Sequence, residues 1–301
     1  MRILLLGAQG QVGTELQHSL ALLGELISCD RQMANLEDIP ALTSLIDHYS
    51  PTFIVNAAAY TQVDAAEIHH KKAHQINAVA VEAIATIAKK IDAFFIHYST
   101  DYVFDGQKSG PYDENDESIP LNIYGQTKRE GELAILNSGC SSLIFRTSWV
   151  HGLRGNNFIK TILKLATERS QLNIVSDQWG TPTSSQFIAD VTAQAIKSII
   201  FSRHTFPHTL YHLTAKGETT WCDYAKFIVK TAQEIRWNNK LTPENIIPIL
   251  SKDYATAAQR PLNSRLNTQR LESDFSLKIP SWEDQVKNTL YALCRDKELT
   301  S

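Results

Sequence analysis

The first half of the chain alternates short apolar runs with longer stretches in which apolar residues recur at helical spacing. The short runs predict β-strands at residues 3–6, 25–29, 53–56, 94–98 and 143–147. The stretches between and after them predict helices at residues 14–23, 42–48, 77–90 and 125–136. Strands that alternate with helices are typical of βαβ units. The pattern therefore predicts an α/β fold, a Rossmann-like doubly wound parallel sheet.

The second half has a looser pattern, with helices predicted at residues 157–168, 187–200 and 221–234. The loops between these helices carry many polar and aromatic residues, which suits a substrate-binding lobe. We expect residues 1–150 to form an NAD(P)-binding Rossmann domain. Residues 151–301 should form mainly a smaller C-terminal substrate-binding lobe, with some segments returning to the first domain. A chain of 301 residues, 43% of them hydrophobic, is long enough for both parts.

Composition narrows the class of protein. Lys and Arg number 29 against 32 Asp and Glu, and the net charge of −3 argues against a nucleic-acid partner. The four cysteines are scattered and form no C-x-x-C pair, so neither a disulfide framework nor a cysteine metal site is expected. The first apolar run ends at Gly7, too early for a signal sequence, and no run reaches membrane-spanning length. We expect a cytoplasmic protein with no membrane partner.

A ladder of glycines follows the first predicted strand. It has the spacing G-x-x-G-x-x-G and leads directly into a predicted helix. Strand, tight turn and helix form the context in which backbone N–H groups and a helix N-terminus meet a pyrophosphate. A sharp turn without a ligand is the alternative. The residues expected to bind the cofactor here are Gly7, Gly10, Gln11, Val12 and Gly13.

Two later strand ends extend the predicted cofactor site. Asp30 lies 20 residues beyond Gly10, where a dinucleotide fold places its contact with the adenosine ribose. Asp30 would accept from the ribose 2′-hydroxyl, whereas Arg31 would pair with a 2′-phosphate. NADPH is therefore the expected cofactor and NADH stays open, while a surface ion pair is the alternative for both residues. A third strand ends in small residues that let a cofactor approach the backbone: Ala57, Ala58 and Ala59.

Tyr124 and Lys128 stand four residues apart at the start of a predicted helix. Residues at this spacing share one helix face, so the Lys128 ammonium should lie near the Tyr124 phenol. A nearby cation favours the phenolate and would lower the tyrosine pKa toward neutrality. Such a tyrosine is a proton donor for a carbonyl that receives a hydride. The alternative is a solvated pair on a helix surface.

Five blocks in order carry a resemblance to a known family. They are the glycine ladder, Ser-Thr-Asp-Tyr-Val-Phe-Asp-Gly at 99–106, Tyr-Gly-x-Thr-Lys at 124–128, Arg-Thr-Ser-Trp-Val at 146–150 and Asp-Gln-Trp-Gly-Thr-Pro-Thr at 177–183. With Arg-Pro-Leu-Asn-Ser-Arg-Leu at 260–266, nearly the whole chain resembles the dTDP-4-dehydrorhamnose reductase family of the extended short-chain dehydrogenase/reductase superfamily.

The resemblance implies a reaction and its residues. The enzyme would use NAD(P)H to reduce the C4 keto group of dTDP-4-dehydro-L-rhamnose, the last step of dTDP-L-rhamnose synthesis. Tyr124 would protonate the C4 oxygen, Lys128 would hold the cofactor ribose, and Thr100 would hydrogen-bond the same carbonyl. The residues expected to bind the nucleotide sugar are Thr100, Asp101, Trp149 and Arg260, with Arg265 as a second diphosphate partner. Two rivals remain: a reductase or epimerase of another nucleotide sugar, and a non-catalytic regulatory subunit on the same scaffold.

One departure from the family concerns magnesium. Some bacterial members form a dimer bridged by magnesium through glutamates of the first helix and the carboxy-terminal lobe. Here Glu15 matches the first of these, but Gln186 and Ala292 stand where further carboxylates are expected. Magnesium prefers carboxylate oxygens, so we expect no metal site, doubtful magnesium dependence, and a monomer or weak homodimer. His70 and His74 share a helix face, but no carboxylate stands at the glutamate position of an H-E-x-x-H zinc site.

Overall fold

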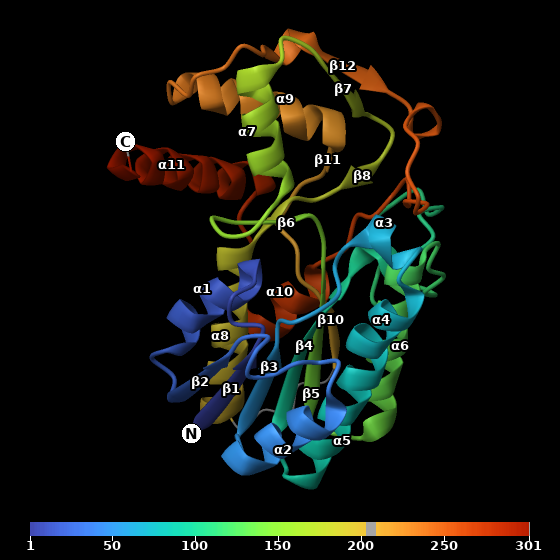
Figure 1. Ribbon diagram of the computed structural model, residues 1–301, viewed down its shortest axis with the longest axis vertical. Helices are drawn as coiled ribbons and strands as arrows, with labels where there is room; N and C mark the ends of the chain where they lie inside the picture. Colours follow the sequence, from blue (N-terminus) through green and yellow to red (C-terminus); the bar gives the residue numbers. More distant parts are fainter. Residues whose placement is uncertain (203–208, 301) are drawn as a thin grey trace.

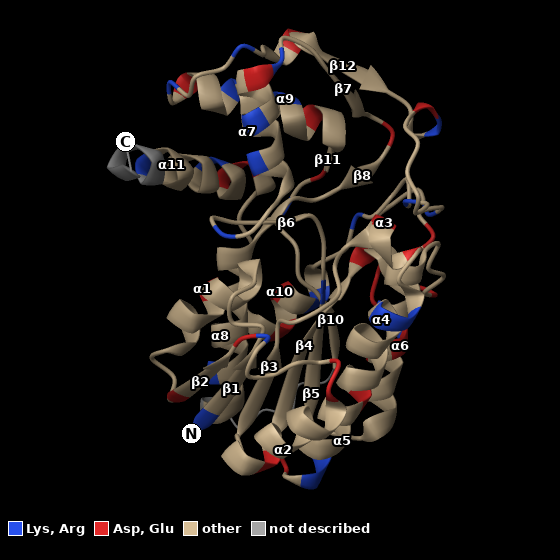
Figure 2. Cartoon of the chain, viewed as in Figure 1, with Lys and Arg blue, Asp and Glu red and all other residues tan. Residues whose placement is uncertain are grey.

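The computed structural model describes residues 1–202 and 209–300, with side chains described up to residue 200 and from 209 to 295. Two layers of helices enclose a central sheet in the lower part of the molecule, and a smaller helical lobe lies above it (Figure 1). Figure 2 shows acidic and basic residues interspersed over both parts. Among the described residues, no helix is both long and apolar enough to cross a membrane.

The central sheet has six parallel strands in the order β10-β5-β4-β3-β1-β2. Their bounds are β1 Arg2–Leu6, β2 Glu25–Cys29, β3 Phe53–Asn56, β4 Phe94–Thr100, β5 Ser142–Thr147 and β10 Leu210–His212. The chain order reverses between β1 and β3, so their carboxyl ends flank the crevice where α/β sheets bind ligands. Strand β1 is apolar at successive positions because both faces of the sheet are covered.

Helices cover the two faces of the sheet. On one face lie α1 (Gln11–Leu20), α8 (Ser185–Ser202) and α10 (Gln269–Phe275), over a core that includes Ile3 and Leu5 (Figure 1). The other face carries α2 (Ile39–Tyr49), α5 (Ala80–Lys90) and α6 (Ile123–Ser138). Short helices α3 (Val63–Ala66) and α4 (His70–His74) precede a π-helical turn at Gln75–Val79.

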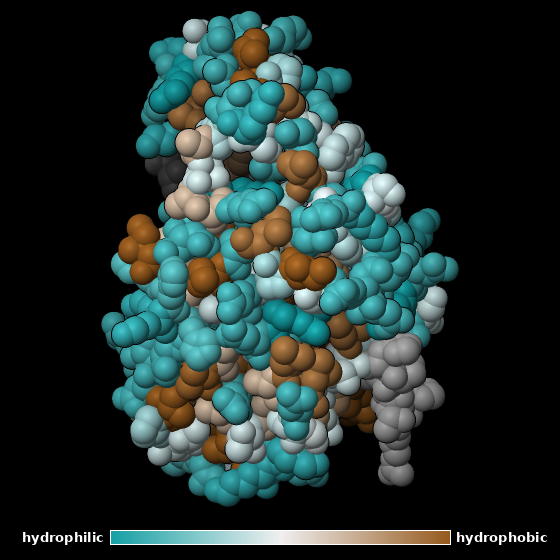
Figure 3. Space-filling view, turned by 90° about the vertical axis from the view of Figure 1, so that its right-hand side faces the viewer, coloured by the Kyte–Doolittle hydropathy of each residue, from teal (hydrophilic) through white to brown (hydrophobic). Residues whose placement is uncertain are grey.

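The upper lobe has its own apolar core, formed mainly by α7 (Phe158–Glu168), α9 (Trp221–Glu234) and α11 (Trp282–Thr300). Short strands complete it: β6 Val150–His151, β7 Leu172–Val175, β8 Trp179–Gly180, β9 Thr183–Ser184, β11 Thr219–Thr220 and β12 Ile246–Ile249. Short 3₁₀ turns stand at Asp101–Val103, Pro243–Asn245 and Ser251–Asp253. On the face drawn in Figure 3, apolar residues form small separate groups among hydrophilic ones.

The predicted fold class is confirmed, and the differences lie in detail. All five predicted strands exist, and the sheet gains β10, a three-residue strand too short to give a period. The single helix predicted at 77–90 is instead a π-helical turn followed by α5. The boundary proposed at residue 150 stays a prediction. Beyond that residue, α8, β10 and α10 all pack against the central sheet or its helices.

Candidate active site

The glycine ladder forms the turn between β1 and α1. Gly7 has a φ of +80°, and a Cβ atom added there would lie 2.7 Å from the backbone nitrogen of Ala58. A Cβ atom on Gly13 would lie 2.0 Å from the carbonyl oxygen of Gly7. Both positions therefore require glycine, because a side chain at Gly7 would push the turn away from the segment after β3 and one at Gly13 would push α1 away from the turn. The turn is further held by N–H donation from Gly7 and Ala8 to the carbonyl oxygen of Cys29, at 3.0 Å each.

The N-terminus of α1 is suited to an anion. Gly10 is the N-cap and offers no side chain to the first helical N–H groups, and the first turn contains no acidic residue. Free N–H groups and the helix dipole together attract a phosphate. Gln11 contributes a second feature, since its Oε1 accepts from Nδ2 of Asn157 at 3.0 Å. Asn157 is the N-cap of α7, so this bond joins the predicted cofactor loop to the upper lobe.

The residues predicted to meet the adenosine ribose, Asp30 and Arg31, follow β2 and form the ribose corner, which differs from the glycine turn in carrying charged side chains. Oδ1 of Asp30 accepts from the backbone N–H groups of Gln32 and Met33, and its Oδ2 accepts from Gln9. Arg31 is exposed and pairs with Glu37 at 2.6 Å. The structure therefore places Arg31 beside Asp30 as predicted, but with a carboxylate partner that sequence reasoning missed.

Thr100 and Asp101 stand at the carboxyl end of β4. Both are buried, and the Thr100 hydroxyl donates to Oδ1 of Asp101 at 2.9 Å and accepts from the N–H of Tyr102 at 3.2 Å. Burial raises the pKa of Asp101 to about 7, against the hydrogen bond from Thr100, which favours the carboxylate. Ser99 faces the opposite way, as strand alternation predicts, beside Glu132.

Tyr124 lies in the first turn of α6. That turn is fixed by Asn122, whose side chain accepts from the N–H of Gly125 at 2.8 Å, and by Glu67, which accepts from the N–H of Ile123 at 2.8 Å. The Tyr124 side chain reaches Thr100, whose hydroxyl proton is given to Asp101. Burial raises the pKa of Tyr124 to about 12, and the charge of Asp101 acts in the same direction.

Lys128 shares the helix face of Tyr124 but does not bind its phenol. Its ammonium nitrogen lies 3.1 Å from Nε2 of His97 and 2.5 Å from the carbonyl oxygen of Tyr98. The side chain is buried, and burial lowers the pKa of Lys128 to about 8. The predicted lowering of the Tyr124 pKa by Lys128 is wrong for this structure. The carbonyl oxygen of Tyr98 on β4 holds the lysine instead, and desolvation dominates the pKa of the tyrosine.

A buried ion pair supports α6 from behind. Arg146 on β5 contacts Glu132 through two bonds of 2.8 and 2.7 Å, and both side chains are at most 1% exposed. The Arg146 guanidinium helps keep the pKa of Glu132 low, although burial alone would raise it. Glu132 stands four residues after Lys128, so one helix face carries the tyrosine, the lysine and this anchor. Sequence reasoning saw Arg146 only as part of a family block.

The predicted substrate residues lie in different surroundings. Trp149 has a φ of +46° and stacks on Trp221 with ring centroids 3.6 Å apart. It is half-buried at the edge of the upper core. Arg260 forms a bidentate pair with Asp64, at 3.1 and 2.6 Å. That pair brings the segment around residue 260 back to α3, near Tyr102.

Arg265 has its own partners. It pairs with Glu218 at 2.9 Å and lies 5.7 Å over the Trp179 ring. The acidic partners Asp64 and Glu218 were not expected from the sequence, because no spacing links residues so far apart along the chain.

Of the residues considered for magnesium, Glu15 lies on α1 and Gln186 on α8, two helices that contact each other, whereas Ala292 lies on α11. Glu15 is buried, and burial raises the pKa of Glu15, as does the nearby Asp190, while Arg154 lowers it. Gln186 donates to Oδ1 of Asp190 at 2.9 Å. Sequence reasoning missed Asp190. Within the described ranges, no group of three or more His, Cys, Asp or Glu side chains could hold a metal ion.

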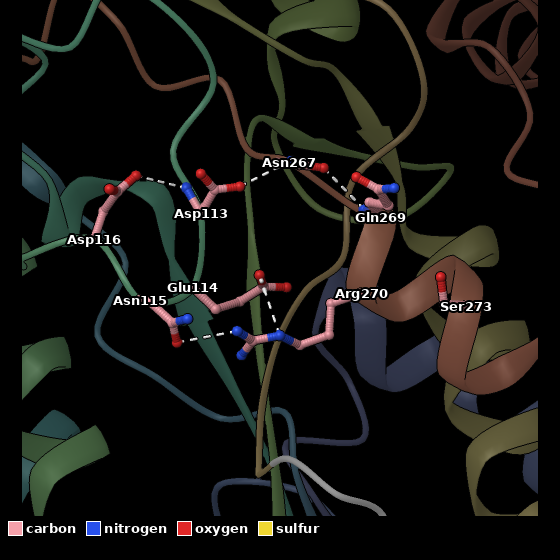
Figure 4. Close-up of a pocket in the computed structure, with 8 residues that line it drawn as sticks. All are labelled: Asp113, Glu114, Asn115, Asp116, Asn267, Gln269, Arg270 and Ser273. Atoms are coloured by element: carbon pink, nitrogen blue, oxygen red, sulfur yellow. Dashed lines mark hydrogen bonds and ion pairs between the residues drawn. The ribbon is translucent and has the colours of Figure 1, made fainter.

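A separate polar pocket of about 460 Å³ lies between the loop after β4 and α10 (Figure 4). Two of its charged groups pair with each other, since Arg270 contacts Glu114 at 3.5 Å, and Arg270 also contacts Asn115 at 3.0 Å. None of the predicted catalytic or cofactor residues lines it. The lining residues are Asp113, Glu114, Asn115, Asp116, Asn267, Gln269, Arg270 and Ser273.

A glycine turn at the head of a parallel sheet, with Thr, Tyr and Lys at the end of β4 and the start of α6, defines an oxidoreductase of the short-chain dehydrogenase/reductase type. The family model described as the RmlD substrate binding domain matches residues 1–294. The chain belongs to this dTDP-4-dehydrorhamnose reductase family, which confirms the resemblance seen in its motifs.

Relatives match over nearly full length. The chain is 44% identical to a dTDP-4-dehydrorhamnose reductase of Escherichia coli K12, over 97% of this chain and 98% of that protein. It is 43% identical to the dTDP-4-dehydrorhamnose reductase of Burkholderia thailandensis, over 94% and 95%. Among solved structures, the reductase of Bacillus anthracis in complex with NADP has a TM-score of 0.86 at 32% identity, covering 97% of this chain and 99% of that one.

Proposed function

We propose that this protein reduces the C4 keto group of dTDP-4-dehydro-L-rhamnose with NADPH, and that Tyr124, Thr100 and Lys128 carry the reaction. Full-length relatives at 43–44% identity bear the name of this reductase, and a structural relative is bound to NADP. The chain retains all three residues, which argues against a non-catalytic subunit on the same scaffold.

The observation that carries the proposal is the placement of Thr100 at the carboxyl end of β4 beside Tyr124 and Lys128 of α6, with Lys128 held by the Tyr98 carbonyl oxygen of β4 at 2.5 Å. Because burial raises the pKa of Tyr124 to about 12, the phenol keeps its proton at neutral pH. A protonated phenol beside a second hydroxyl is an arrangement that donates to one carbonyl oxygen. Tyr124 would release its proton as negative charge develops on that oxygen, and the Thr100 hydroxyl would turn from Asp101 to hold the oxygen in place.

The cofactor residues fit a dinucleotide on structural grounds. Added Cβ atoms at Gly7 and Gly13 would meet backbone, which leaves a turn that a pyrophosphate can approach closely. The uncapped N-terminus of α1 supplies N–H donors. Asp30 would accept from the adenosine ribose, and Lys128 would hold the nicotinamide ribose. When bound, the reduced nicotinamide supplies the hydride.

The preference for NADPH rests on Arg31. Its guanidinium is exposed at the ribose corner and would pair with a 2′-phosphate, at the expense of its contact with Glu37. NADH lacks that phosphate and would rely on Asp30 alone. We propose both cofactors as substrates, with NADPH bound more tightly.

The test is a rate assay with defined nucleotide sugars. Purified protein should oxidise NADPH when given dTDP-4-dehydro-L-rhamnose, and chromatography should identify dTDP-L-rhamnose as product. UDP-linked 4-keto sugars serve as the comparison, because the short-chain fold also serves other sugar nucleotides. A faster rate with such a sugar would reassign the substrate, and no oxidation with any 4-keto sugar would refute the enzymatic function.

A further inference from the structure

A buried chain of hydrogen bonds joins β3, β4 and α6 behind Tyr124. Nδ2 of Asn56 lies 3.3 Å from Nδ1 of His97, and Nε2 of His97 lies 3.1 Å from the Lys128 amine nitrogen. Asn56, His97 and Lys128 are each at most 2% exposed. None of the predicted roles uses Asn56 or His97, and buried polar groups of this kind must satisfy one another.

The orientation of Asn56 fixes the tautomer of His97. Oδ1 of Asn56 accepts from the N–H of Ala58 at 3.1 Å, so a flipped amide would set two donors against each other. The amide nitrogen therefore faces His97 and donates to Nδ1. Burial holds the pKa of His97 well below its usual range, so the ring is neutral. With Nδ1 as acceptor, its proton is on Nε2.

That proton points at Lys128. An ammonium has three donors and no lone pair, so an Nε2–H facing it is a contact between two donors. An uncharged amine can accept from Nε2–H and still donate to the carbonyl oxygen of Tyr98, 2.5 Å away. The two forms of the lysine therefore differ by one buried hydrogen bond.

We infer that His97 is a positioning residue for Lys128: locked by Asn56 with Nε2–H outward, it stabilises the uncharged amine and disfavours the ammonium. The inference rests on the proposed role of Lys128 in holding the ribose and supporting Tyr124. Burial acts on Lys128 in the same direction as the inferred effect of His97 and is the largest cause of its lowered pKa.

Other ionisable groups around Lys128 act against this effect or lie away from it. Glu132 on α6 raises the pKa of Lys128, but its charge is shared with Arg146 of β5 and with Arg129. The Tyr98 phenol of β4 turns away to Thr192, at 2.7 Å. Tyr124 on α6 stays protonated at neutral pH. His97 is thus the ionisable side chain in hydrogen-bond contact with the amine.

The first experiment needs no substitution. Nitrogen-15 NMR of histidine-labelled protein should show His97 as the Nε2–H tautomer, unchanged between about pH 6 and 8 because the ring stays neutral. An Nδ1–H tautomer, or a ring that protonates in that range, would overturn the inference.

A substitution tests the link to the lysine. In His97→Gln the side-chain Oε1 can face Lys128 and accept from an ammonium. The titration midpoint of Lys128, followed by NMR of its labelled side chain, should rise by about one pH unit or more, the size expected for a hydrogen bond to a charged group. Tyr98→Phe is the matched control, since it alters the adjacent core residue but leaves the carbonyl contact, and its Lys128 midpoint should stay in place. An equal midpoint in His97→Gln and the wild type would overturn the inference.

A second variant acts through the tautomer. In Asn56→Asp the carboxylate accepts from both the Ala58 N–H and Nδ1–H, so His97 should switch to the Nδ1–H form and turn a lone pair toward Lys128. A ring that keeps Nε2–H in this variant would contradict the tautomer argument.

The pH profile of kcat/KM separates this inference from the proposed role of Lys128. The profile reports groups of the free enzyme, and the ammonium is lost as pH rises through its pKa. The alkaline limb should therefore move to higher pH in His97→Gln, together with the NMR midpoint. A moved midpoint with an unmoved limb would uphold the contact with His97 and refute the catalytic role of the lysine.

Discussion

Two regions of the candidate site differ in burial: the catalytic corner, at the end of β4 and the start of α6, is buried, whereas the ribose corner around Arg31 is exposed. Thr100, Asp101 and Lys128 are buried, each with partners fixed by β4 and α6. Arg31 is exposed, and its contact with Glu37 is a surface ion pair. A buried group has no water to replace a lost partner, whereas a surface pair is worth little and is easily exchanged. Substitutions in the first corner should change the reaction, and those in the second should change only the choice of cofactor.

The largest effect is expected at Tyr124. Tyr124→Phe removes the proton donor but keeps the ring, so kcat should fall by about 10²-fold or more while folding and cofactor binding persist. Tyr112→Phe is the control, because it also removes a buried hydroxyl, one that donates to Asp105 at 2.6 Å rather than to a substrate. A Tyr124→Phe variant that keeps more than half of the wild-type kcat would end the assignment.

Asp101 should make stability depend on pH. Its pKa is raised to about 7 in the folded protein, so the native state holds a proton that the unfolded chain has lost above about pH 4. The stabilisation is complete below the unfolded pKa and is lost as pH rises through about 7. Asp101→Asn cannot ionise, so its free energy of unfolding, measured by urea denaturation, should decline less between about pH 5 and 8.

Asp105→Asn serves as the control for that slope. The hydrogen bond from Tyr112 lowers the pKa of Asp105. Asp105 therefore contributes to the free energy of unfolding with the opposite sign to Asp101, and its contribution is lost as pH falls. Identical slopes for Asp101→Asn and the wild type would show that Asp101 is ionised throughout the range.

The contrast between the corners also explains what the sequence could predict. The glycine ladder and the Tyr-x-x-x-Lys spacing are local sequence patterns. The structure has the first in the turn after β1 and the second on the first turns of α6, as these patterns predict. Partners distant in sequence carry no periodic signal. Glu37 at Arg31, Asp64 at Arg260 and His97 at Lys128 come from other elements, so only the fold reveals them.

The pKa of Tyr124 shows the same limit. Helical spacing correctly placed Lys128 on the same helix face as Tyr124. The direction of the pKa shift of Tyr124, however, depends on burial, and the lysine is held by a carbonyl oxygen of β4 instead of the phenol. Neither quantity is encoded in a four-residue spacing.

A smaller effect is expected at the ribose corner. Arg31→Ala should weaken NADPH more than NADH, by about tenfold or less, because the wild-type Arg31 must give up Glu37 to reach a phosphate. Glu37→Gln is the complementary variant and should tighten NADPH by freeing Arg31. Dissociation constants from fluorescence titration test both. Equal losses for the two cofactors in Arg31→Ala would show that this residue does not meet the 2′-phosphate.

The smallest effect should follow removal of magnesium. Glu15 lies near Arg154, whose charge competes with any cation, and Gln186 offers a neutral amide oxygen in place of a carboxylate. A hard cation held by so few free carboxylate oxygens would bind weakly. We therefore expect EDTA to leave the reductase rate nearly unchanged, and any dimer to persist without metal. Light scattering with and without EDTA, run beside the rate assay, decides the matter: a dimer that dissociates together with loss of activity, and recovers on adding magnesium, would refute the prediction.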